Sequence, residues 1–139
     1  MGVVLDTSVL NAAERQKLNL GSFAAANKDR SFLLTAITAA EFLHGVERAH
    51  PATRRAKLSA FAEKLFASIP IHDYDLAVAR RQATLWGTLA TAGNLLGPYD
   101  LIIAASALEY GHSLATLNVG EFSWGPGLWL VELTAYLDT

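Results

Sequence analysis

Apolar residues fall into short runs typical of buried strands, separated by longer stretches with helical periodicity. Val3–Leu5, Phe32–Thr35 and Ser113–Thr116 are brief, mostly apolar runs, which favour strands covered on both faces of a parallel sheet. The run Ile69–Ile71 has a central proline and suits an edge strand. A fifth strand is expected at Leu128–Val131.

Helices are expected in the intervening stretches. Pro51 should end one helix and Gly93 another. The segment 99–110 is apolar almost all round, so its helix should be buried. The expected helices are Thr7–Glu14, Ser22–Lys28, Thr38–Arg48, Thr53–Ala67 (with an apolar stripe of Leu58, Phe61, Leu65 and Phe66), a long helix from Asp73 or Tyr74 to Ala92, and Tyr99–Tyr110.

This alternation predicts an α/β fold, in which helices cover both faces of a central, mostly parallel five-stranded sheet. Residues 1–139 should form one domain of three layers, α/β/α. Right-handed crossovers would place the first and fourth strands side by side, at a point where the strand order reverses. Ligands in open α/β sheets bind at the carboxyl ends of the strands there.

Composition narrows the class of protein. Apolar residues make up 52% of the 139 residues and mean hydropathy is +0.26, which excludes a disordered chain. No apolar run approaches a membrane span, and the start Met1–Asp6 lacks the basic residues of a signal peptide, so a cytoplasmic protein is expected. The absence of cysteine excludes thiolate metal sites and thiol nucleophiles.

Charge is unevenly distributed along the chain. Residues 1–81 hold all eleven Lys and Arg against eight Asp and Glu, a net charge of +3. Residues 82–139 hold five acidic residues and no basic ones, a net charge of −5. A phosphate-rich partner would therefore have to meet the first segment. This pattern permits a selective RNA or DNA substrate, but it is not that of a bulk nucleic-acid binder.

Four carboxylates lie in the loops and helices that connect the expected strands. Asp6 follows the first strand, and Glu41 lies in the helix after the second. Asp100 opens the helix before the fourth strand, and Glu121 ends the loop after that strand.

Each carboxylate also has an ordinary explanation. Asp6 could cap the helix that starts at Thr7, and Glu41 could close a capping box with Thr38. Asp100 could compensate a helix dipole, although an unpaired charge is costly on so apolar a helix. Glu121 could be a solvated loop residue.

Together the four carboxylates indicate a metal site. Crowded carboxylates resist ionising together, and a divalent cation reverses that penalty. With no cysteine and no paired histidines, the expected ion is Mg²⁺ or Mn²⁺, which serves phosphoryl transfer by activating water. Polar side chains flank the same crevice and could orient water or phosphate, or could equally make local turn hydrogen bonds: Thr7, Ser8, Thr116 and Asn118.

Four blocks resemble the PIN domain of the VapC ribonuclease toxins of bacterial toxin–antitoxin pairs. These blocks are Val4-Leu5-Asp6-Thr7-Ser8-Val9-Leu10, Ala40-Glu41-Phe42-Leu43-His44-Gly45, Gly97-Pro98-Tyr99-Asp100-Leu101-Ile102-Ile103-Ala104-Ala105 and Thr116-Leu117-Asn118-Val119-Gly120-Glu121-Phe122. They occur in the family's order and spacing.

The resemblance implies a PIN-like fold and a Mg²⁺- or Mn²⁺-dependent endoribonuclease with Asp6, Glu41, Asp100 and Glu121 as its acidic residues. It also implies a homodimer that is inhibited by a cognate VapB-type antitoxin. The fourth acid is often Asp in this family, so the longer Glu121 could act on the metal through water. The blocks around Gly45 and Asp100 look like the branch that cleaves tRNA. A PIN nuclease of RNA maturation and a catalytically silent protein-binding module are the alternatives.

Other residues have two interpretations each. The basic residues after Glu41 are either RNA contacts or the solvated face of a helix: Arg48, Arg54, Arg55 and Lys57. The three tryptophans are expected in the core or at a dimer contact rather than as base-stacking platforms: Trp86, Trp124 and Trp129.

Overall fold

A five-stranded parallel sheet organises the computed structural model, which describes residues 2–138. The strand order is β3-β2-β1-β4-β5, so the first and fourth strands are neighbours, as predicted. All four strand pairings in the described residues are parallel. The strands are β1 (Val3–Leu5), β2 (Phe32–Thr35), β3 (Ile71–His72), β4 (Ser113–Ala115) and β5 (Leu130–Val131).

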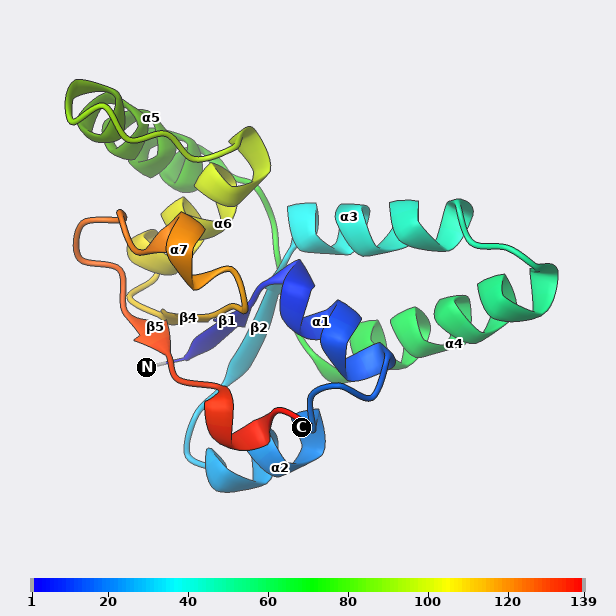
Figure 1. Cartoon of the computed structure of the whole chain (residues 1–139). Coiled ribbons are helices and arrows are strands. Elements are labelled where there is room, and N and C mark those ends of the chain that lie inside the picture. The colour runs from blue at the N-terminus through cyan, green and yellow to red at the C-terminus, as the bar shows by residue number, and fades with distance from the viewer. Residues whose placement is uncertain (1, 139) are drawn as a thin grey trace.

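Helices cover both faces of this sheet (Figure 1). The two short elements at the end of the chain, α7 and η1, were not expected from the sequence. The helices are α1 (Thr7–Glu14), α2 (Leu20–Ala26), α3 (Ala36–Glu47), α4 (Ala52–Ser68), α5 (Leu76–Thr91), α6 (Pro98–Glu109), α7 (Val119–Phe122) and the 3₁₀ helix η1 (Thr134–Tyr136).

Alternation along the central strand builds two separate cores. Val3 and Leu5 belong to the core shared with α1, α2, α3 and α4. Val4 points the other way, into the core that includes residues of α5, α6 and α7. Successive side chains of a strand face opposite sides of a sheet, so a fully apolar strand must be covered twice. The three-layer α/β/α prediction is confirmed.

Two predicted helix starts are wrong. The side chain of Thr35, not Thr38, caps α3 by accepting a hydrogen bond from the Thr38 amide. Glu41 is therefore not part of a capping box. Thr53 does not cap α4 either, because Pro51 holds the N-cap position and no side chain caps that end.

Smaller boundary errors occur at edges. β3 comprises Ile71–His72 rather than Ile69–Ile71. α2 begins two residues earlier than expected, at Leu20, because the side chain of Asn19 caps it by accepting from the Ser22 amide. Helix ends commonly shift by one or two residues in this way.

Of the two positions expected for the tryptophans, the core is wrong, and a dimer contact stays a prediction. Trp86, Trp124 and Trp129 are all exposed, with Trp129 74% accessible. Within residues 2–138, no helix has the length and apolar character needed to cross a membrane.

Candidate functional site

Register brings two distant loops to the same edge of the sheet. Leu5 of β1 pairs with Ala115 of β4, and each is the last residue of its strand. Asp6 and Thr116, which follow them directly, therefore lie side by side. The amide of Asp6 donates to the carbonyl of Ala115 at 2.9 Å. The carboxyl ends of the two central strands therefore present both side chains together, as the sequence predicted.

Asp6 is buried, and two hydroxyl groups hold its carboxylate. Its Oδ2 accepts a hydrogen bond from Ser8 Oγ and another from Thr116 Oγ1, both at 2.8 Å. Asp6 occupies the N-cap position of α1, yet its side chain makes no capping bond. Since the carboxylate is only 2% exposed, these two donors are what makes its charge tolerable there.

The hydroxyl groups of Thr7, Ser8 and Thr116 take part in a small hydrogen-bond network. Ser8 Oγ accepts from the amide of Leu117 at 3.0 Å, and Thr116 Oγ1 accepts from the amide of Asn118 at 3.0 Å. Thr7 Oγ1 donates to Glu41 Oε1 at 2.8 Å, which ties α1 to α3. The hydroxyls of Thr7, Ser8 and Thr116 thus orient carboxylates. Local turn bonds are present as well, because Ser8 bonds Asp6 and the Asn118 amide bonds Thr116, each two residues away.

Asp100 responds electrostatically to the other three acids. Its pKa is raised from 3.8 to about 6, first by desolvation and then by the negative charges of Asp6, Glu41 and Glu121. Like charges disfavour further ionisation in just this way. The four carboxylates, although distant in sequence, therefore share one electrostatic environment.

Three of these acids line a common cavity of about 510 Å³, which we call the acid pocket. Glu121 is exposed and does not line it. Among residues 2–138, no three His, Asp or Glu side chains stand close enough together to enclose a metal ion. The acid pocket is lined by Asp6, Glu41 and Asp100, the polar residues Thr7, Ser8, Asn11 and Asn118, the basic residues Arg15 and Lys17, and Ala12 and Leu117.

Oxygen atoms dominate what this pocket offers to a ligand. Asp6 Oδ1 and Glu41 Oε2 accept no hydrogen bond from the rest of the described chain, so each keeps a free lone-pair face. Carboxylate, hydroxyl and amide oxygens are the donors preferred by hard divalent cations. The donor set fits Mg²⁺ or Mn²⁺.

Two of the four predicted RNA contacts are engaged elsewhere. Arg54 forms a two-pronged ion pair with Glu14, whose side chain is 3% exposed and whose pKa is lowered chiefly by this hydrogen bond. Arg55 donates to the carbonyl oxygens of Val46 and Glu47. These arginines therefore fasten α4 to α1 and α3.

Arg48 and Lys57 are exposed, and among the described residues neither makes an ion pair. Sequence reasoning missed Arg15 and Lys17, which line the acid pocket and likewise have no ion-pair partner among residues 2–138. Their position just after α1 was the available signal, because Asp6 directly precedes that helix as its N-cap residue.

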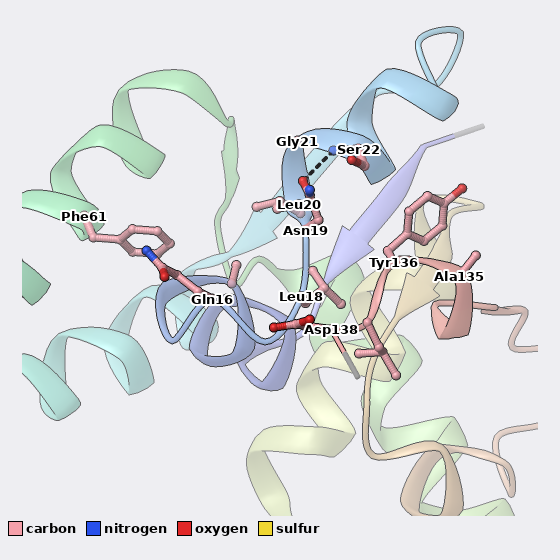
Figure 2. Close-up of a pocket in the computed structure, with 12 residues that line it drawn as sticks. Gln16, Leu18, Asn19, Leu20, Gly21, Ser22, Phe61, Ala135, Tyr136 and Asp138 are labelled. Atoms are coloured by element: carbon pink, nitrogen blue, oxygen red, sulfur yellow. Dashed lines mark hydrogen bonds between the residues drawn. The ribbon is translucent and has the colours of Figure 1, made fainter.

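A second cavity of about 660 Å³ opens on the other side of α1, and we call it the C-terminal hollow (Figure 2). It is lined by residues between Gln16 and Ser22, which lead into the first turn of α2, by Phe61 of α4 and by residues at the end of the described chain, including Tyr136. The four acids do not line this hollow.

The amino-acid sequence matches a known family model. Residues 3–122 match the model described as PIN domain. Among curated proteins, the chain is 29% identical to Ribonuclease VapC1 of Rickettsia felis, over 97% of this chain and 98% of the relative. It is 30% identical to the tRNA(fMet)-specific endonuclease VapC of Shigella flexneri, over 83% of this chain and 78% of that protein.

Solved structures agree with these relatives. A chain of the DNA-bound VapBC crystal structure from Salmonella typhimurium superposes with a TM-score of 0.84 at 26% identity, covering 94% of this chain and 97% of that one. A chain of VapBC-5 from Mycobacterium tuberculosis superposes with a TM-score of 0.76 at 27% identity, covering 95% and 99%.

Proposed function

The chain belongs to the PIN-domain family, and we propose that it is the toxin of a VapBC-type pair that cleaves RNA with a divalent cation. Within the family it is similar to VapC ribonucleases along most of its length. The observation that carries this proposal is the convergence of Asp6, Glu41 and Asp100 on the acid pocket. The raised pKa of Asp100 supports it, because beside desolvation, the largest cause, the charges of the other three acids contribute to the shift.

In this proposal Asp6, Glu41 and Asp100 would supply the carboxylate oxygens that hold Mg²⁺ or Mn²⁺. Because no three acids in the described residues stand close enough to enclose an ion by themselves, water would complete its ligand set. Glu121, which lies outside the pocket, would act through such water. When bound, such a cation neutralises charge on a phosphodiester and lowers the pKa of an attacking water. The positioning of the acids and of the substrate depends on side chains of the protein itself.

Hydroxyl groups position the acids. Ser8 and Thr116 fix one oxygen of Asp6 and leave Oδ1 free, while Thr7 fixes one oxygen of Glu41 and leaves Oε2 free. A carboxylate already held in place loses little conformational freedom when it takes up a ligand. Asn118, at the rim of the same pocket, offers an amide to the substrate or to its bound water.

The relatives suggest the substrate and partners. One relative is a tRNA(fMet)-specific endonuclease, so we propose tRNA as the first RNA to test. The structural neighbours are VapBC complexes, which supports a VapB-type antitoxin as the partner of this chain. A homodimer and a cytoplasmic location complete the proposal.

Sequencing RNA ends after a short pulse of expression tests the activity and names the substrate together. Wild-type chain should create new ends at one or a few sites in RNA and arrest growth, whereas Asp6→Asn should create none. Identical RNA ends in the two cultures would reject the proposal. Purified wild type assayed with Mg²⁺, with Mn²⁺ and with a chelator then tests the metal requirement.

A further inference from the structure

A third hollow adjoins the acid pocket, and we call it the Tyr99 hollow. Its volume is about 520 Å³, and it shares Thr7, Asn11 and Glu41 with the acid pocket. Its own walls are Ile37, Ala40, His44, Arg48 and Tyr99. A ligand that reached the acids could therefore extend into it without a break.

Tyr99 is the aromatic wall of this hollow. Its side chain is 53% exposed, and within residues 2–138 it makes no hydrogen bond and no ring contact. It sits in the first turn of α6, next to Asp100, where Pro98 occupies the first helical position. The ring is therefore placed by a helix and is left free, at the edge of a strongly charged pocket.

The remaining walls combine apolar and cationic character. Ile37 packs against the core below and gives the hollow an apolar surface. His44 is exposed on α3, and Arg48 is exposed at the C-terminal end of that helix. Neither side chain forms a hydrogen bond or an ion pair with another described side chain. An aromatic face, an aliphatic surface and a cation together match a nucleotide, whose base has a π face and whose backbone carries negative charge.

We propose that the Tyr99 hollow binds an unpaired nucleobase next to the phosphodiester that is cut, with the base stacked on the Tyr99 ring and Arg48 facing the adjoining phosphate. This inference rests on the proposed function and adds a substrate-binding site to it. Since stacking requires a splayed base, the enzyme selects single-stranded loops over paired RNA. Arg15 and Lys17, which line the acid pocket, then meet the phosphates of the strand close to the cut.

Cleavage kinetics of four chains test this site. Tyr99→Phe keeps the ring and should cleave like wild type. Tyr99→Leu keeps apolar volume without a ring, and its KM should rise about 5- to 150-fold with kcat little changed, which is the loss expected for one stacked base. Trp129→Ala is the matched control, because it removes an exposed aromatic side chain that does not line the hollow, and it should match wild type.

A fluorescence measurement reports on stacking itself. Short RNAs spanning the cut site, with 2-aminopurine on one side of the cut or the other, are bound to the inactive Asp6→Asn chain. One of the two labelled positions should be quenched, and adding Tyr99→Leu should abolish that quenching. Melting temperatures of all variants show whether each chain is folded.

The outcomes are distinct. If a folded Tyr99→Leu chain had the KM of wild type, and if adding Tyr99→Leu to the Asp6→Asn chain left the quenching unchanged, the inference would be overturned. The ribonuclease proposal would stay intact. So would a Tyr99→Phe chain as impaired as Tyr99→Leu, because the hydroxyl would then matter rather than the ring. A wild-type chain that cleaves no RNA would overturn the proposed function, and this inference with it.

Discussion

The acid pocket and the C-terminal hollow both border α1, and their chemistry separates them more clearly than their size does. The hollow is the larger, at about 660 Å³ against about 510 Å³. Yet Asn19, one of its polar residues, already forms hydrogen bonds within the fold. Its side chain caps α2, and its backbone amide donates to the carbonyl of Tyr136 at 2.8 Å. The acid pocket instead keeps free carboxylate oxygens beside free cations.

This difference follows from where each cavity lies in the fold. The acid pocket is at the carboxyl edge of β1 and β4, where loops from distant parts of the chain must meet. The C-terminal hollow lies where a helix connection meets the last residues of the described chain. Volume alone would direct attention to the wrong cavity, whereas convergent charge identifies the one suited to catalysis.

Removing an acid from the acid pocket should have the largest effect. We expect Asp100→Asn to lower RNA cleavage about 10²- to 10⁴-fold, because it removes a charge that acts on the transition state. The matched change in the C-terminal hollow, Asp138→Asn, should leave cleavage unchanged. Initial rates on the RNA named by end sequencing measure both. Equal losses in the two variants would erase the functional distinction between the cavities.

Glu121 should matter much less than the acids inside the pocket. It is exposed and outside the pocket, so Glu121→Gln should lower cleavage by no more than about fivefold, as for an exposed charge interaction of about 1 kcal/mol. The same rate assay at several Mg²⁺ concentrations measures this effect. A loss as large as that of Asp100→Asn would mean that Glu121 contacts the metal directly.

The pH dependence of stability should reveal the cost of ionising Asp100, which comes first from desolvation and then from the neighbouring negative charges. Because folding raises the pKa of Asp100 from 3.8 to about 6, the folded chain binds this proton more tightly than the unfolded chain. Stability from this group is fully present below pH 3.8 and is lost as pH rises through about 6. We expect Asp100→Asn, which cannot ionise there, to melt a few degrees above ion-free wild type at pH 7 and level with it near pH 4.

Manganese supplies the control for that experiment. At pH 7, Mn²⁺ should raise the melting temperature of wild type and close the gap to Asp100→Asn, because the cation offsets the repulsion. A gap that does not change with pH would show that crowding at Asp100 is not the cause.

The smallest functional effect is expected in the C-terminal hollow. Asn19→Ala removes the cap of α2 and should lower the free energy of unfolding by about 1 kcal/mol, with no change in cleavage. Denaturant unfolding and the RNA assay measure the two quantities on the same preparation. Impaired cleavage in a folded Asn19→Ala chain would show that the two cavities are coupled.

Sequence sufficed for the central strands of the sheet and for the expectation that Asp6, Glu41 and Asp100 lie together, whereas Glu121 lies outside the pocket. Val3–Leu5 and Ser113–Ala115 are short, mostly apolar runs, which favour buried strands, and Asp6 follows the first of them directly. Once the strand order was inferred, the neighbourhood of Asp6 and Thr116 followed from the rule that parallel strands end at one edge.

What the sequence could not give depends on contacts between distant segments. Arg54 looks like a solvent-facing helix residue until Glu14 is found buried against it, forty residues away. Thr38 fits a capping box as well as any residue, yet Thr35 takes the cap because β2 delivers it to that position. Tyr99 is one tyrosine among four until the helices place it beside Glu41.

The hydrogen bond between Thr116 and Asp6 joins residues 110 positions apart. A polypeptide still being synthesised cannot make this bond until β4 has left the ribosome, so Asp6 lacks one of its two hydroxyl donors for most of translation. Truncated products and stalled chains that end before residue 113 would carry Asp6 and Glu41 but no assembled acid pocket. Toxicity would then be confined to nearly complete molecules, and fragments left by proteolysis would be harmless to the cell.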